Sequence, residues 1–165
     1  MENIIDRIYV GSDADVAEAK RRGYSRLTCA KDGPDGHRAM LGYTTLGAPQ
    51  DDQYLFAHRG HWGALNCIDH EDVGFIPTKM ILAGLKWAKK EYDAGRTILF
   101  HCNAGHSRGP TTAFMFLRAI GEMPHGFIES MKIFRKLYPE YSPGIGMKQK
   151  AQELWRELPT LFKDK

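Results

Sequence analysis

Short apolar runs alternate along this chain with longer segments whose apolar residues recur every three or four positions. The short runs have the length and the β-branched content of buried strands, and they lie at residues 7–10, 25–30, 64–68 and 97–101. The longer segments have the period of helices. Strands that alternate with helices predict an α/β fold, in which a central, mainly parallel, twisted sheet is flanked by helices.

Start and stop signals support this assignment. Ser12, with Asp15 three residues later, resembles a capping box at the start of a helix over 13–22, and Gly23 follows that helix. Pro77 marks the start of another helix. The C-terminal half is expected to be rich in helix, with further helices over 113–120, 127–137 and 147–158.

Length and composition favour one domain over residues 1–165. Of the 165 residues, 42% are apolar, 26% charged and 11% aromatic, which is ordinary for a globular protein and supplies one core rather than two. No apolar run approaches the length of about 18 residues that a membrane span needs, and no signal-peptide pattern is visible. The three cysteines form no CxxC pair and predict no disulfide framework. We therefore expect a cytoplasmic protein without membrane attachment.

Charge is distributed unevenly. Residues 1–78 carry 8 Lys and Arg against 12 Asp and Glu, whereas residues 79–165 carry 15 against 8. The basic half is either solvated helix surface or a region that attracts an anion. No dense basic block with interleaved aromatic residues occurs, so no nucleic-acid partner is expected. His58 and His61 lack further ligands at metal-binding spacing, so we expect neither a metal nor a cofactor.

The strand at 97–101 leads into HCNAGHSRG, residues 101–109, in which Cys102 and Arg108 form a Cys-x5-Arg pair. The spacing alone is weakly specific, but here an apolar strand enters the loop and a helix leaves it. Backbone N–H groups of a tight loop at a helix N-terminus bind phosphate and stabilise a thiolate. Arg108 can add a bidentate contact, and a thiolate beneath a phosphate is placed for in-line attack. A buried inert thiol with a surface arginine is the weaker interpretation.

Expulsion of an alkoxide or phenoxide also requires a general acid. The strand at 64–68 ends at the same expected sheet edge and is followed by Asp69, His70, Glu71 and Asp72. Asp69 directly follows the strand, which makes it the preferred acid, and Asp72 is the alternative. The aspartate that is not the acid is expected to be a turn former.

HCNAGHSRGPT resembles the signature of the cysteine-based protein tyrosine phosphatases, in the HCxAGxSR form of the dual-specificity branch. The segment IIDRIYVGSDADVAEAKRRGYSRLTCA resembles that branch's opening strand, helix and strand, and SPGIGMKQKAQEL is similar to its closing helix region. Residues 31–62 match least. The resemblance implies a dual-specificity-phosphatase-like fold.

The resemblance also implies roles for the site residues. Cys102 would be the nucleophile, Arg108 would bind phosphate and steady the transition state, and His101 would support the thiolate from behind. An acid at the place of Asp69 or Asp72, upstream of the nucleophile, agrees with the family pattern. The amides of the loop would bind the substrate, with His106 facing outward, and come from Asn103, Ala104, Gly105, His106 and Ser107.

One position departs from the family pattern. After the signature arginine, family members usually carry Ser or Thr, whose hydroxyl helps to hydrolyse the phosphoenzyme, whereas this chain has Gly109. Thr111 and Thr112 are close in sequence but are expected to point elsewhere. Glycine would keep the junction of loop and helix flexible. We therefore expect either a slow second step or a water that replaces the hydroxyl.

These features predict a phosphatase that acts on phosphorylated protein side chains through a phosphocysteine intermediate. The compact chain has no obvious insertion to deepen a pocket around phosphotyrosine, which favours dual specificity. An inositol phosphate or an RNA 5′ phosphate is an alternative substrate, disfavoured because phosphoinositide-type loops tend to carry lysines where Asn103 and His106 stand. A second alternative, suggested by Gly109, is a phosphate-binding module with little turnover.

Overall fold

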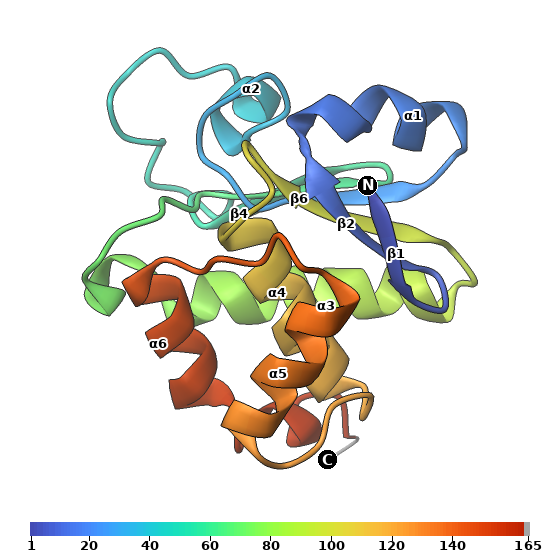
Figure 1. The fold of residues 1–165 in the computed structure, drawn as a ribbon. Helices are drawn as coiled ribbons and strands as arrows, with labels where there is room; N and C mark the ends of the chain where they lie inside the picture. The colour runs from blue at the N-terminus through green and yellow to red at the C-terminus, as the bar shows by residue number, and fades with distance from the viewer. Residues whose placement is uncertain (164–165) are drawn as a thin grey trace.

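The computed structural model describes residues 1–163, which form a six-stranded mixed sheet in the order β1-β2-β6-β3-β5-β4 (Figure 1). The strands are β1 (Glu2–Ile5), β2 (Ile8–Ser12), β3 (Ser25–Thr28), β4 (Phe56–Arg59), β5 (Trp62–Leu65) and β6 (Ile98–Cys102). The four central strands are parallel, and the edge strands β1 and β4 are antiparallel to their neighbours. The predicted α/β fold with a mainly parallel sheet is confirmed.

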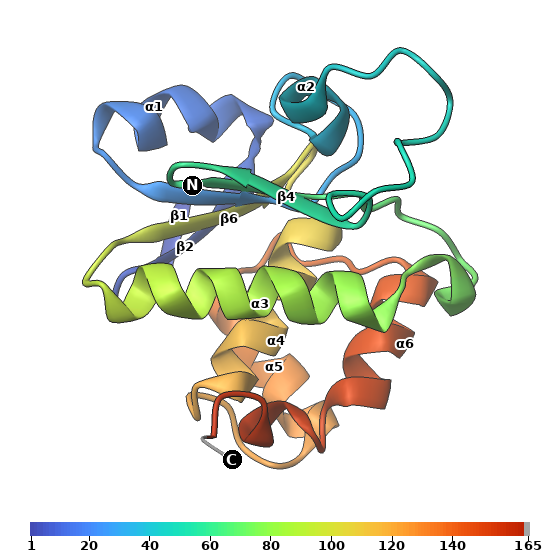
Figure 2. The same ribbon diagram turned by 180° about the vertical axis from the view of Figure 1, so that it is seen from behind.

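Helices cover both faces of the sheet, as Figures 1 and 2 show. One face carries the short helices α1 (Val16–Arg21) and α2 (His37–Leu41). The other carries the longer helices α3 (Thr78–Asp93), α4 (Arg108–Ala119), α5 (Phe127–Leu137) and α6 (Ile145–Leu154). The expected helix-rich C-terminal half is confirmed. Within residues 1–163, no helix has the length and apolar character to cross a membrane.

The core lies mainly between the sheet and α4. Every residue of β6 is buried, and α4 is buried along its whole length because the sheet covers one side and later helices cover the other (Figure 1). Phe114 of α4 packs against Phe134 and Trp155, with ring centroids 5.1 Å and 4.5 Å apart. On the same helix, Phe116 packs against Phe100 of β6 with ring centroids 5.3 Å apart, which holds α4 against the strand that ends at Cys102.

The structure adds β1 and α2, which the sequence pattern did not predict, and it places the edge strand β4 within residues 38–62, where the pattern indicates one strand and a long loop without bounds. The edge strands are short and partly exposed, so they carry no continuous apolar run. The strand predicted over 64–68 is instead β5, which ends at Leu65, so Asp69 does not directly follow the strand as expected but is separated from it by residues 66–68. The helix predicted over 13–22 begins as a 3-10 turn, η1 (Asp13–Asp15), and the capping box from Ser12 to Asp15 is present. Two further 3-10 turns are η2 (Val73–Phe75) and η3 (Leu158–Thr160).

Candidate active site

Cys102 is the last residue of β6, Arg108 is the first of α4, and residues 102–108 form the Cys-Arg loop between them. Gly105 bends this loop with a φ of +79°, a conformation that side chains other than glycine rarely adopt. A β-carbon on Gly105 would also lie 2.9 Å from the carbonyl oxygen of Gly11 in β2. The tight turn and the close approach of β2 therefore both require glycine at this position.

The Cys-Arg loop is braced from outside through its carbonyl groups. The three braces are the Asp13 N–H to the Asn103 carbonyl (3.4 Å), the Tyr138 hydroxyl to Gly105 (2.9 Å) and the Ser142 N–H to His106 (2.8 Å). By contrast, across the described residues 1–163 the backbone N–H groups of 103–107 donate no hydrogen bond to the protein. A ring of free N–H groups at a helix N-terminus is an arrangement that binds phosphate-like anions.

The thiol in this loop differs from the other two. Cys102 is 2% exposed and lies at the start of the loop that carries the free N–H groups. Cys29 and Cys67 are buried below the sheet edge, and burial raises the pKa of the Cys29 thiol well above its ordinary value. Burial likewise raises the pKa of Cys67 to about 12. Cys29 and Cys67 therefore remain thiols at neutral pH and are poor nucleophiles.

Arg108 is held across the loop by two acceptors. Its Nη1 donates to the carbonyl oxygen of Cys67 at 3.0 Å, and its Nη2 donates to Oδ1 of Asn103 at 2.8 Å. A guanidinium has five N–H donors, so three remain for a ligand. The geometry leaves Arg108 able to make a two-point contact with an oxyanion bound in the loop.

A chain of polar contacts runs beneath the loop. The fully buried His101 shares a 2.8 Å hydrogen bond with the Thr28 hydroxyl, and its Nδ1 lies 3.3 Å from Oδ1 of Asp13. The other carboxylate oxygen of Asp13 accepts from Nδ2 of Asn103 at 2.9 Å. Burial opposes ionisation of Asp13, but contacts with His101 and Asn103 outweigh it and hold the pKa of this carboxyl below its ordinary value. Asp13 thus connects His101 to Asn103, which in turn holds Arg108.

Sequence reasoning missed Asp13 and Tyr138. Asp13 follows β2, and the parallel register pairs Ser12 of β2 with Cys102 of β6, so Asp13 falls at the same sheet edge as the loop. The capping box at Ser12 is the sequence signal that could have found it, because it marks the turn after β2 in which Asp13 and Asp15 lie. No sequence signal points to Tyr138, because its contact with Gly105 depends on how α5 packs.

The two candidate aspartates have different surroundings. The carboxylate of Asp69 packs against Gly144, where a β-carbon would overlap it, and the N–H of Gly144 donates to the Ser107 hydroxyl at 2.8 Å. Asp69 therefore lies beside the Cys-Arg loop. Asp72 instead caps η2, where its Oδ1 accepts from the N–H of Gly74 at 2.8 Å. The structure gives Asp72 the position of the turn former.

Gly109 serves close packing rather than flexibility. It is buried in the first turn of α4 and does not have a positive φ. A β-carbon here would lie 2.7 Å from the carbonyl carbon of His101 and 2.9 Å from the nitrogen of Cys102. Thr111 and Thr112 do point elsewhere, since their hydroxyls bond Tyr141 and the Arg108 carbonyl.

Searches against protein-family models and among curated proteins found no match to this sequence. Solved structures do match. Human DUSP28 is 13% identical, with 97% of this chain and 99% of that chain covered and a TM-score of 0.68. DUSP15 is 15% identical, with coverage of 98% and 91% and a TM-score of 0.66. The chain has the fold of the dual-specificity phosphatases. The dual-specificity-phosphatase-like fold implied by the signature is thereby confirmed.

A third match shows that this fold is shared by a phosphatase-like interacting protein. The human tyrosine phosphatase-like serine/threonine/tyrosine-interacting protein is 14% identical, with 93% of each chain covered and a TM-score of 0.61. The fold therefore accounts for the position of the Cys-Arg loop but does not establish an activity. The function has to be argued from the residues in the loop.

Proposed function

We propose that this chain is a cysteine-dependent phosphatase that hydrolyses phosphomonoesters on protein side chains, phosphotyrosine as well as phosphoserine and phosphothreonine. The observation that carries the proposal is the ring of free N–H groups at 103–107, in the loop that begins at Cys102 and across which Arg108 is held. The non-bridging oxygens of a phosphate monoester need several donors at once, and this ring together with the guanidinium supplies them.

In the first step, the Cys102 thiolate attacks phosphorus opposite the leaving oxygen. The S–P bond forms while the P–O ester bond breaks. The loop N–H groups and Arg108 stabilise the charge on the non-bridging oxygens. Asp69, in its protonated form, transfers its proton to the leaving oxygen, so that the product departs as a neutral alcohol or phenol. The position of Asp69 beside Gly144 and the loop supports this role.

In the second step, the Asp69 carboxylate takes a proton from water, and the water oxygen attacks the phosphocysteine. The S–P bond breaks, inorganic phosphate forms, and the Cys102 thiolate is regenerated. The loop N–H groups and the N-terminus of α4 stabilise this thiolate. Because Gly109 offers no hydroxyl to the departing sulfur, we expect this step to limit turnover.

The experiment compares wild type with Cys102→Ser on p-nitrophenyl phosphate and on phosphotyrosine and phosphothreonine peptides. We expect the variant to lose activity to background and to keep phosphate affinity, because a serine hydroxyl is not ionised at neutral pH. Cys29→Ala is the matched control, since Cys29 is a buried cysteine outside the loop, and it should stay active. Activity of Cys102→Ser above background would overturn the covalent mechanism.

The same assay separates the alternatives. Inositol phosphates and an RNA with a 5′ phosphate are run beside the peptides, and a higher kcat/KM on either would replace the protein-substrate assignment. The low-turnover binding module is favoured by Gly109 alone. It would be supported if wild type bound phosphate as tightly as Cys102→Ser does and released no product beyond one equivalent.

A further inference from the structure

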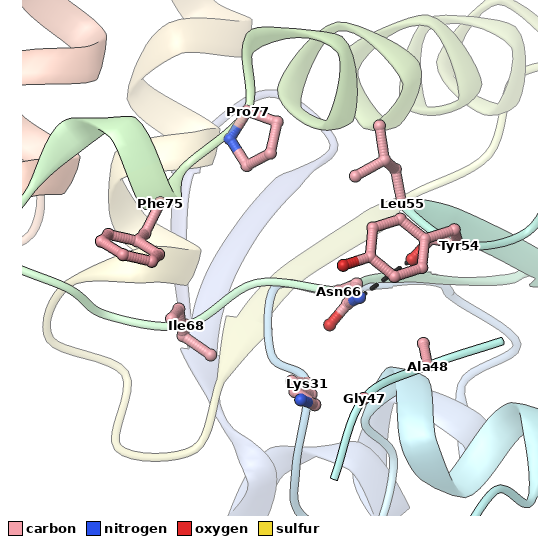
Figure 3. Close-up of a pocket in the computed structure, with 9 residues that line it drawn as sticks. All are labelled: Lys31, Gly47, Ala48, Tyr54, Leu55, Asn66, Ile68, Phe75 and Pro77. Carbon is pink, nitrogen blue, oxygen red and sulfur yellow. Dashed lines mark hydrogen bonds between the residues drawn. The ribbon is translucent and has the colours of Figure 1, made fainter. Parts of the chain in front are cut away.

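A hollow of about 160 Å³ lies at the segment after β5, where Asn66 and Ile68 line it (Figure 3). Apolar side chains and polar groups both line it, the former from Ala48, Leu55, Ile68, Phe75 and Pro77 and the latter from Lys31, Tyr54 and Asn66. Figure 3 shows the rings of Phe75 and Tyr54 on opposite sides of the space, with Pro77 and Lys31 closing its other two sides. For comparison, an apolar cavity of about 150 Å³ accepts a benzene molecule. The hollow therefore has room for one aromatic or branched aliphatic side chain.

The hollow shares its framework with the loop. The carbonyl oxygen of Cys67 accepts both from the N–H of Lys31, at 2.8 Å, and from Arg108, at 3.0 Å. Lys31 and Ile68 line the hollow, and Ile68 stands between Cys67 and Asp69 in the chain. One short segment thus borders the hollow, anchors Arg108 and carries the proposed acid.

The separation between hollow and loop suits a peptide. Cys102 ends β6, the segment with Ile68 follows β5, and β3 lies between these strands. Two strand spacings correspond to about 10 Å. An extended peptide covers roughly 3.3–3.6 Å per residue, so about three residues bridge this separation.

Apolar surface is concentrated at this rim. Phe75 is 58% exposed, Ile68 is 37% exposed, and Leu46, next to the lining residue Gly47, is 89% exposed. The ammonium group of Lys31, the cation in the lining, donates to the Leu46 carbonyl at 2.6 Å. The hollow therefore favours an apolar group over a second phosphate.

The wall of the hollow is preformed. It belongs to the irregular segment 42–55, here called the wall loop, which side chains from neighbouring elements hold by its carbonyl groups. These contacts run from Lys31 to Leu46, from Arg38 to Thr45, from His37 to Gln53 (2.7 Å) and from Asn66 to Tyr54 (3.0 Å). Preformed hollows that combine apolar walls with a few fixed polar groups are typical of ligand sites.

We propose that the hollow is a substrate-recognition subsite, which takes one apolar side chain of a phosphorylated peptide within three residues of the phosphorylated residue. The inference rests on the proposed function and adds a sequence preference to it. Tyr54 and Phe75 are its specificity-determining residues, because their rings flank the space that the substrate side chain enters.

The test uses phosphotyrosine peptides with alanine at all flanking positions except one, which carries Phe, Leu or Asp and is moved from −3 to +3. At one position, we expect Phe or Leu to raise kcat/KM over Ala by roughly 10- to 100-fold and Asp to give no gain. Phe75→Ala and Tyr54→Ala should each remove most of this gain. Each value is divided by the kcat/KM of the same variant for p-nitrophenyl phosphate, which does not reach the hollow.

Ile128→Ala on α5 is the matched control, because Ile128 is 61% exposed but does not line the hollow, and it should keep the gain. Wild type that cleaves all peptides equally well would overturn the subsite and leave the phosphatase proposal intact. A gain that persists in both Phe75→Ala and Tyr54→Ala would overturn its location. Absence of hydrolysis of p-nitrophenyl phosphate itself would overturn the proposed function.

Discussion

The Cys-Arg loop and the wall loop lie at the same edge of the sheet but are built in different ways. The first is a run of consecutive residues, with one glycine turn and carbonyl braces. The second has no regular structure and is held by side chains from the segment after β3, from α2 and from the segment after β5. In our proposal the difference separates two tasks, since the nucleophile and the phosphate-binding donors come from one short contiguous stretch, whereas substrate recognition depends on contacts between distant segments. Substitutions that affect only one task test this division.

After the complete loss at Cys102, the largest effect on chemistry is expected at Asp69. Asp69→Asn should lower kcat/KM for poor leaving groups by about 10²–10⁴-fold and remove the basic limb of the pH–rate profile, because the proton donor is lost. Steady-state kinetics with alkyl and aryl phosphates measure both effects. Asp72→Asn is the matched control and should change little, because asparagine also caps η2. The reverse pattern would make Asp72 the acid.

A smaller but still large loss is expected at Arg108. Arg108→Lys should lower kcat/KM for p-nitrophenyl phosphate by about 10²–10³-fold, because an ammonium group cannot make the planar two-point contact. Arg135→Lys, on the exposed side of α5, controls for the exchange itself. An Arg108→Lys enzyme within tenfold of wild type would contradict the assigned role.

A substitution of Asp13 tests whether the Cys-Arg loop depends on contacts with residues outside it. Asp13→Asn should lower kcat/KM by about 10-fold, because His101 and Asn103 lose their charged partner. A carboxyl whose pKa is lowered by folding stabilises the folded state above its ordinary pKa of 3.8, and that stability is lost as the pH falls through the lower folded value. The Tm difference between wild type and variant should therefore be greatest near neutral pH and shrink in acid. A difference independent of pH would show that Asp13 acts only by packing.

Gly109 tests whether the junction of the loop and α4 tolerates a side chain. Gly109→Ala and Gly109→Ser should both destabilise the fold by roughly 1–3 kcal/mol, because each places a β-carbon against the backbone of His101. Thermal unfolding measures this, and the two variants should differ little. If Gly109→Ser alone increased the steady-state rate, the hydroxyl would be contributing to phosphocysteine hydrolysis in spite of the contact.

The smallest effect is expected in the wall loop. Arg38 contacts the Thr45 carbonyl and pairs with Asp32 at 2.8 Å on the surface. Such exposed contacts contribute about 0.2–1 kcal/mol, so Arg38→Gln should lower the peptide preference by at most about fivefold. The kcat/KM for p-nitrophenyl phosphate serves as the internal reference. An equal loss on both substrates would show that the two loops are not separable.

The sequence predicted the parts of this molecule that local patterns encode. The parallel strands and long helices carry periodic apolar residues, and the Cys-Arg loop is contiguous, so both were predictable. Asp13 was not, because it contacts Asn103 across 90 residues of sequence. The bounds of β4 and the contacts of the wall loop could not be predicted, because exposed residues and side-chain-to-carbonyl contacts leave no periodic signal.

The anchoring of Arg108 has a thermodynamic consequence. Its guanidinium is held by the Cys67 carbonyl and by Asn103, so its side-chain rotamers are restricted by the fold itself. Immobilising such a side chain during binding costs about 0.5–1.5 kcal/mol. Here that entropy is lost when the chain folds, and an arriving oxyanion meets a donor that is already oriented. Asn103 thus contributes to the affinity for the ligand indirectly, because its amide oxygen orients Arg108 before binding and so reduces the entropy that binding costs.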